Sequence, residues 1–133
     1  MDARQINLQV RHDSIKTMLE KFSVNSSELK WDSDKKSLLI ESILLNLPIG
    51  SFTFYGFNEC IDGNNRFLSV RSFMQDEFML SNLSYLPFEN RFFTELPQWN
   101  IRRIEEYITT INYIQPYCEK EVKKDLYLRF GKR

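Results

Sequence analysis

The chain has 133 residues, a length typical of one domain, and its 42% apolar and 27% charged residues are ordinary for a soluble globular protein. Its 18 basic and 18 acidic side chains cancel, which excludes a strongly basic nucleic-acid binder and leaves only local patches for DNA contact. Two cysteines and one histidine are too few for a zinc site, and no apolar run reaches the roughly 20 residues that span a bilayer. We therefore expect a cytoplasmic protein with reduced thiols and no membrane association.

Residue spacing and turn residues predict an α+β domain with a small mixed sheet and packed helices. The predicted elements, in chain order, are helix 14–22, helix 35–46, strand 52–57, strand 59–61, helix 66–74, strands 77–83 and 90–93, helix 100–107, strand 109–114 and helix 117–130. A polar loop at 23–30 separates the first two helices, and the strands before and after Pro87 are predicted as an appended hairpin.

The second predicted helix is the strongest in the chain. Ser33 or Asp34 is expected to cap it, and Pro48 to end it, because proline disfavours helical geometry in the residue before it. Its apolar face is predicted from four side chains at helical spacing: Leu39, Ile43, Leu44 and Leu47. Glu41 is expected to face solvent, with a contact to a site near Asp62 as the alternative.

The turn between the strand at 59–61 and the following helix is the most informative stretch, with the sequence Asp-Gly-Asn-Asn-Arg at 62–66. Gly63 lets the backbone bend sharply, and the first turn of a helix presents free N–H groups with a partial positive charge. Arg66 adds a planar cationic donor for phosphate oxygens, and the two asparagines add donors and acceptors. A phosphate would fit this turn. The simpler alternative is a surface turn in which Asp62 caps the helix or pairs with Arg66.

Four segments in one order extend this interpretation: 39–50, 61–70 with Phe73, 93–97 and 126–131. In that order they resemble the ParB/sulfiredoxin-like domains with an Asp-Gly-Gln-x-Arg signature, which form the nucleotidase part of modification-dependent restriction systems of the GmrSD type. The resemblance covers roughly residue 33 to the C-terminus, which would leave 1–32 as an N-terminal helix and loop.

The resemblance implies a ParB/sulfiredoxin-like fold and a nucleoside triphosphate as cofactor, with or without Mg²⁺. Asp62 would then orient a water molecule or hold Mg²⁺, and Arg66 would stabilise charge on the transferred phosphoryl group. The residues that would contact the nucleotide are Gly63, Asn64, Asn65, Arg66 and Arg129. The wider role implied is nucleotide-linked DNA defence or counter-defence.

Three departures from the family favour binding over catalysis. Asn64 is one methylene shorter than the signature glutamine, and Asn65 is likewise short. The family's early Phe-Gln-Arg segment has no clear match in 22–31, and Phe130 stands where the family usually has asparagine. We also expect no HNH-type nuclease domain to follow, since the chain stops at 133 and its only histidine is His12. The domain is therefore expected to act with a protein partner.

Three alternatives to this reading are open at the level of sequence. The chain can be a non-enzymatic, phage-type anti-defence inhibitor that binds a host protein. It can also be a DNA-binding module using Arg102 with Arg103, or a C-terminal basic set: Lys120, Lys123, Lys124, Arg129, Lys132 and Arg133. Acidic neighbours favour solvated helix faces for both patches. Cys60, two residues before the turn, can be a sulfiredoxin-like nucleophile or a small buried strand-end residue.

Overall fold

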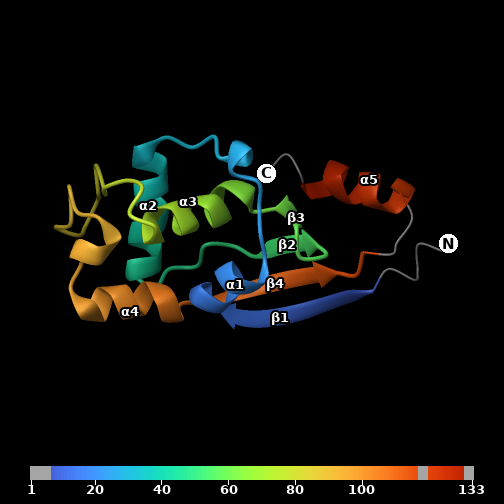
Figure 1. The fold of residues 1–133 in the computed structure, drawn as a ribbon, viewed down its shortest axis with the longest axis horizontal. Coiled ribbons are helices and arrows are strands. Elements are labelled where there is room, and N and C mark those ends of the chain that lie inside the picture. Colours follow the sequence, from blue (N-terminus) through green and yellow to red (C-terminus); the bar gives the residue numbers. More distant parts are fainter. Residues whose placement is uncertain (1–6, 117–119, 131–133) are drawn as a thin grey trace.

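The structure, a computed structural model, describes residues 7–116 and 120–130. Its elements, in chain order, are β1 Leu8–Ser14, α1 Ile15–Lys21, η2 Ser26–Glu28, α2 Ser33–Leu44, β2 Phe52–Tyr55, β3 Glu59–Asp62, α3 Asn64–Met74, η3 Phe93–Glu95, α4 Gln98–Glu106, β4 Ile108–Ile114 and α5 Lys120–Phe130 (Figure 1). The α+β class is confirmed. The last helix was predicted from residue 117, and its first three predicted positions lie outside the described residues.

The sheet has four strands in the order β1-β4-β2-β3. It is mixed, as predicted, because β4 pairs antiparallel with β1 and parallel with β2, while β2 pairs antiparallel with β3. β1 was not predicted, since none of its residues is fully buried and it lacks the alternation of a half-buried strand. Its pairing with β4 places residues 8–14 in the same sheet as β2 and β3.

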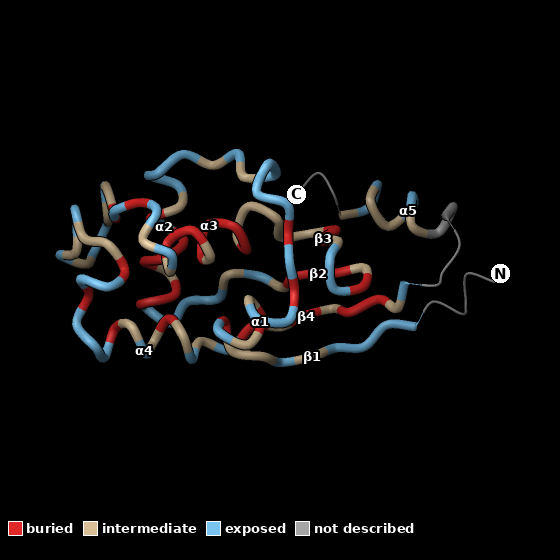
Figure 2. Tube along the Cα trace, in the orientation of Figure 1, coloured by how far each residue is buried: buried red, intermediate tan, exposed pale blue. Residues whose placement is uncertain are grey.

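Two apolar clusters hold the helices against one another and against one face of the sheet. The cluster beneath α1 and α3 is built largely from aromatic and aliphatic side chains of four elements: Met18, Phe22, Phe52, Phe54, Phe67, Leu68, Ile111 and Tyr113. The other lies among α2, α3, α4 and the loop after α3, and includes Ile40, Ile43, Val70, Phe73 and Ile104. Buried residues lie along β2, α2 and α3, whereas β1 is largely exposed (Figure 2).

The helix α2 begins and ends two residues earlier than predicted and is capped by a different residue. Its N-cap is Asp32, whose carboxylate accepts the N–H of Lys35 at 2.9 Å, so the prediction of Ser33 or Asp34 as the cap was wrong. The helix ends at Leu44, before Pro48, and Asn46 takes a left-handed conformation with φ 59°. Leu47 therefore leaves the predicted apolar face and is 47% exposed.

The hairpin predicted on either side of Pro87 is also wrong, because the structure has no strand between α3 and η3. Phe78 and Leu80 are both buried. Apolar residues two positions apart are also typical of a half-buried strand, which explains the wrong prediction. The backbone of Leu80 even exchanges hydrogen bonds with Asn90 and Arg91, as in a hairpin. Left-handed backbone at Asn82 and Asn90 interrupts the extended chain, so the segment is an ordered loop.

Glu41 organises that loop and does not face solvent, which corrects the expectation from sequence. Its side chain is buried, and its carboxylate accepts the N–H groups of Ser84, Tyr85 and Leu86 at 2.8 to 2.9 Å. Burial opposes the charge, but these three hydrogen bonds outweigh it and lower the pKa of the carboxyl below its ordinary value. Glu41 is thus a structural anchor, and it makes no contact with Asp62.

The remaining helices agree with the sequence to within a few residues. α1 is capped by Ser14, whose hydroxyl accepts the N–H of Thr17 at 3.1 Å. α3 begins two residues earlier than predicted and buries Phe67, Val70 and Phe73 as expected. α4 also begins two residues early, directly after Pro97. These small shifts move no predicted core residue to the surface.

Candidate functional site

The segment 62–66 joins a strand to a helix, as predicted. β3 ends at Asp62, Gly63 is the N-cap of α3 with φ 108°, and the helix begins at Asn64. Glycine is required at this position for two reasons, since the backbone is left-handed and an added Cβ would lie 2.7 Å from Cδ1 of Phe52. The first N–H groups of any helix lack an intrahelical acceptor, and no side chain caps those of α3.

This turn lines a pocket with a volume of about 810 Å³. The walls come from the loop around η2, from Gly50 and Ser51 before β2, from β3 with its preceding turn, and from α5. All five residues of the segment 62–66 contribute to the lining. The pocket is thus a concave space at the start of α3, where the sequence predicts a phosphate site.

Arg66 is held by backbone carbonyl groups. Its Nη1 donates to the carbonyl of Ile49 at 2.8 Å, and its Nη2 donates to that of Ser51 at 3.0 Å. The guanidinium also lies over the ring of Phe52, with 4.7 Å from Cζ to the ring centroid. Burial lowers the pKa of Arg66, with Asp62 acting in the opposite direction. Arg66 therefore fastens α3 to the segment before β2, and two of its five N–H groups serve that purpose.

Asp62 has few partners in comparison. Its side chain is 11% exposed, and the guanidinium of Arg66 approaches its carboxylate only to 3.9 Å. Within the described part of the chain, its carboxylate makes no hydrogen bond. The ion pair expected from the i,i+4 spacing is therefore present but long, and the carboxylate oxygens are available to a ligand, a water molecule or a cation.

The two asparagines of the turn have different roles. Asn65 accepts the backbone N–H of Lys30 at 2.6 Å through Oδ1, which ties the loop after η2 to α3. The Asn64 side chain, in contrast, has no hydrogen-bond partner among residues 7–116 and 120–130. Asn64 is thus the amide of the two that can contact a ligand without first breaking a bond within the protein.

Arg129, predicted as a nucleotide contact, is separated from the other candidates. Its Nε lies 2.6 Å from the carboxylate of Asp125 on the exposed side of α5, outside the pocket lining. Tyr127 and Phe130 of the same helix line the pocket instead. Neither was among the residues predicted for the site, because nothing in the local sequence of α5 indicates that it approaches β3.

A polar cluster fastens α5 to the sheet at the edge of the pocket. Tyr127 donates a hydrogen bond to Glu59, and the Nζ of Lys123 lies 2.8 Å from the same carboxylate and over the ring of Tyr55. Burial opposes ionisation of Glu59, yet Lys123 and Tyr127 lower the pKa of its carboxyl. Burial and Glu59 raise the pKa of Tyr127. Lys123 is therefore engaged in an ion pair within the protein.

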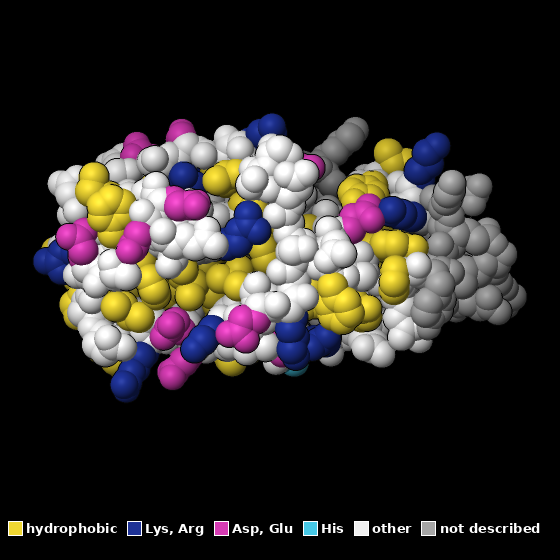
Figure 3. Space-filling model, viewed as in Figure 1, with side chains coloured by type: hydrophobic (Ala, Val, Ile, Leu, Met, Phe, Trp, Pro, Cys, Tyr) yellow, Lys and Arg dark blue, Asp and Glu magenta, His cyan; other side chains and the backbone are white. Residues whose placement is uncertain are grey.

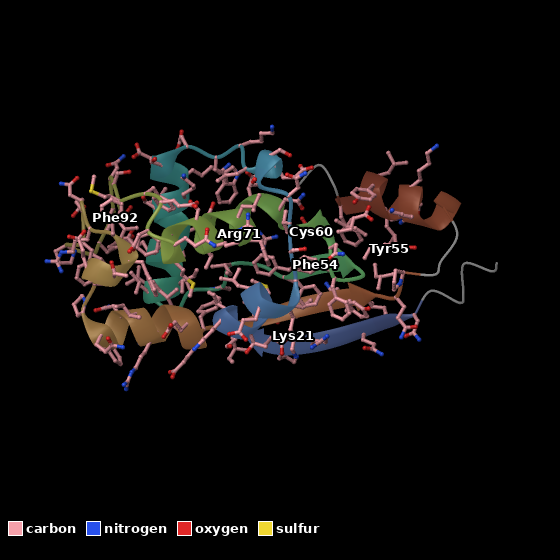
Figure 4. The ribbon with its side chains drawn as sticks, viewed as in Figure 1. Lys21, Phe54, Tyr55, Cys60, Arg71 and Phe92 are labelled. Atoms are coloured by element: carbon pink, nitrogen blue, oxygen red, sulfur yellow. The ribbon has the colours of Figure 1, made fainter. Side chains whose placement is uncertain are left out.

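Cys60 is a buried strand residue with little thiolate character. Its side chain is 5% exposed, and its Sγ donates to the carbonyl of Asp62 at 3.2 Å. Burial, assisted by the charge of Asp62, raises the pKa of the Cys60 thiol to about 12. Figure 4 shows it on β3 beside Phe54 of β2. These properties favour the buried strand-end interpretation over a nucleophile.

The charges around the pocket are nearly balanced. Glu28, Glu59 and Asp62 stand against Lys30 and Arg66 in its lining. Acidic and basic side chains are likewise interspersed over the face shown in Figure 3. Across the described residues, no group of three or more His, Cys, Asp or Glu side chains could hold a metal ion. A cation bound at Asp62 would therefore need further oxygen ligands, from a phosphate, water, an asparagine side chain or a backbone carbonyl.

Comparison with models of known families, with curated proteins and with solved structures finds no match for this chain. Within the described residues, every helix is too short or too polar to cross a membrane.

Proposed function

We propose that this domain binds the phosphate groups of a nucleoside triphosphate in the pocket at the start of α3. The observation that carries the proposal is the uncapped N-terminus of α3, which follows the left-handed Gly63 and lines a pocket of about 810 Å³. Free N–H groups and the helix dipole at such a terminus attract anions. The volume lies within the range of pockets that hold small ligands and cofactors.

Each residue of the turn has a separate role in this proposal. The backbone N–H groups of Asn64 and Asn65 and the Asn64 amide contact a phosphate, and Arg66 offers the N–H groups that do not bind the Ile49 and Ser51 carbonyls. Asp62 holds Mg²⁺ together with phosphate oxygens. Because acidic groups outnumber basic ones in the lining, binding should be tighter with Mg²⁺ than without it.

Hydrolysis by the isolated domain is expected to be slow or absent. Arg66 donates N–H groups to two backbone carbonyls, and Asp62 is the one carboxylate in the segment 62–66. Few further groups in this segment can therefore stabilise a transition state. One lost preorganised donor can cost on the order of a hundredfold in rate. We expect phosphate release well below about one per second, the lower end of ordinary turnover. The wider role, nucleotide-linked DNA defence with a protein partner in the manner of ParB/sulfiredoxin-like domains, belongs to the same proposal.

Calorimetric titration with ATP, GTP, CTP and dTTP, with and without Mg²⁺, tests the proposal. The variant Asn64→Asp places a negative charge in the first turn of α3, where it should repel a phosphate without disturbing the fold. Gln98→Glu is the matched control, because it adds the same charge to the first turn of α4, outside the pocket. We expect the first variant to weaken binding at least tenfold and the control to leave it unchanged. Equal effects, or no binding of any of the four nucleotides, would reject the proposal.

A second candidate function is a non-enzymatic interaction protein, such as a phage-type inhibitor of a host protein. It is favoured by Trp99 and Ile108, which are 66% and 63% exposed beside a hollow of about 750 Å³ that also includes Arg102 and Arg103. Large exposed apolar side chains beside arginine are typical of protein-binding surfaces. The same titrations discriminate the two functions, since an inhibitor of this kind needs no nucleotide. DNA binding, the third alternative, would appear as an affinity that falls steeply with salt.

A further inference from the structure

The outer edge of β1 is an open strand edge. Among the described residues, β1 pairs only with β4, and Figure 1 shows it at the border of the molecule with no other labelled element beyond it. The strand is seven residues long, contains no proline, and pairs with β4 without a register shift. Short length, proline and bulges are three of the features that protect an edge strand from pairing with another chain; charged side chains such as Arg11 and Asp13 are another. β1 therefore lacks three common protections.

The hydrogen bonds at the two ends of β1 show which backbone groups are unpaired. The Ile15 N–H donates to Tyr107, and the Asn7 carbonyl accepts from Gln115, so the odd-numbered residues face β4. Because antiparallel ladders alternate, Leu8, Val10 and His12 direct their N–H and C=O groups away from β4. Leu8 and Val10 are also 53% and 58% exposed.

The geometry points to antiparallel pairing of β1 with β1 of a second copy of this chain, about a two-fold axis at Val10. In this register Val10 faces Val10 of the second copy, Leu8 faces His12, and Gln9 faces Arg11, so no like charges oppose one another. Centring the pair on Arg11 would place two arginines opposite each other. Centring it on His12 would leave Leu8 beyond the paired strands. Centring it on Gln9 would also avoid opposed like charges, but would pair only residues 8–10 of the strand. The Val10 register pairs residues 8–12 and places no like charges opposite each other.

Such a pairing joins two four-stranded sheets into one continuous sheet of eight strands. It is isologous, as two-fold dimers require, because the same strand serves both copies. The formal net charge of zero produces no long-range repulsion between copies. An interface limited to one strand is small, so the dimer should form in the micromolar range. This proposal is independent of nucleotide binding.

Sedimentation of the full chain from low to high micromolar concentration tests the dimer. Val10→Lys places two like charges opposite each other and should weaken the dimer at least tenfold. Leu38→Lys is the matched control, since Leu38 is also an exposed apolar side chain (44%) and lies on α2, away from the open edge. A chain that is monomeric at every concentration, or equal loss of dimer in both variants, would overturn the proposal.

Cysteine cross-linking tests the register and does not depend on the lysine variants. With Cys118→Ser as background, Val10→Cys should form a disulfide between copies under mild oxidation, because opposed residues of paired strands lie about 5.5 Å apart at Cα. His12→Cys should not, because Leu8 of the second copy lies opposite it. Cross-linking of His12→Cys in preference to Val10→Cys would overturn the proposed pairing.

Discussion

The helices α2 and α3 begin in opposite ways. The first turn of α2 is closed by the carboxylate of Asp32, and a second carboxylate of this helix, Glu41, is saturated by three backbone N–H groups. The first turn of α3 follows Gly63, has no side-chain cap, and is preceded by a carboxylate with one ion pair at 3.9 Å. Polar groups that are fully bonded within the protein support the fold, whereas those left open beside a pocket are available to a ligand.

The largest effect is expected at Glu41 of α2, whose carboxylate is fully bonded within the protein. Glu41→Gln should lower the free energy of unfolding by about 2 to 4 kcal/mol, because hydrogen bonds to a charged group contribute about 1.5 to 3 kcal/mol each and an amide can replace them only in part. Urea unfolding at neutral pH measures the loss. Glu89→Gln, on the exposed surface of the same loop, is the control and should change little.

The same carboxylate predicts a dependence of stability on pH. The pKa of Glu41 is lower in the folded protein than its ordinary value of 4.5, so the contribution is present above pH 4.5 and is lost as pH falls through the folded pKa. The difference between wild type and Glu41→Gln should therefore shrink on acidification. A difference that stays constant down to the most acidic pH at which both fold would contradict this account.

The next effect concerns Arg66, in the first turn of α3, and its neighbour on the same helix. Arg71 also donates to a backbone carbonyl, that of Val24 at 3.2 Å, and Figure 4 shows it along α3. It does not line the pocket, so both arginines support the structure but only Arg66 can reach a phosphate. We expect Arg66→Ala to weaken nucleotide binding about tenfold more than Arg71→Ala, since bonds to charged groups are worth about 1.5 to 3 kcal/mol. Equal losses by calorimetry would assign Arg66 a structural role alone.

A smaller effect is expected for the cap of α2. Asp32→Ala removes the hydrogen bond to the N–H of Lys35 and should cost about 1 kcal/mol, as is typical for loss of an N-cap. Chemical unfolding measures the change, and nucleotide binding should be unaffected, since Asp32 does not line the pocket. A loss of binding without a loss of stability would contradict the assignment of Asp32 to the fold.

The sequence predicts contacts between residues that are near one another in the chain, but not contacts between residues that are far apart in it. The turn at 62–66 was predictable, because a glycine lies where residue spacing changes from strand to helix. The partners of Glu41 lie 43 to 45 residues away, and those of Arg66 lie 15 and 17 residues away. No local pattern indicates them. The contact between Tyr127 and Glu59 spans 68 residues and was equally hidden.

The strand β1 escaped prediction for a different reason, which concerns burial. Periodicity reports which residues are buried, and an edge strand exposed on its outer side buries too few residues to show a pattern. The hairpin predicted after α3 is the reverse case, because Phe78 and Leu80 are buried at strand spacing within a loop held by Glu41. In both cases tertiary contacts decided the local structure.

The smallest effect should separate function from stability at α3 most clearly. Asn64→Asp places a carboxylate beside the free N–H groups of the first turn, and should stabilise the free protein by about 0.3 to 1 kcal/mol. Gln98→Glu should give a gain of the same sign at α4. The two variants then differ only in the titration with nucleotide, where the charge at position 64 competes with phosphate. If a substitution stabilises the fold and weakens binding, the original residue serves ligand binding at the expense of stability. Destabilisation by Asn64→Asp in urea unfolding would show instead that the start of α3 already has all its polar groups satisfied.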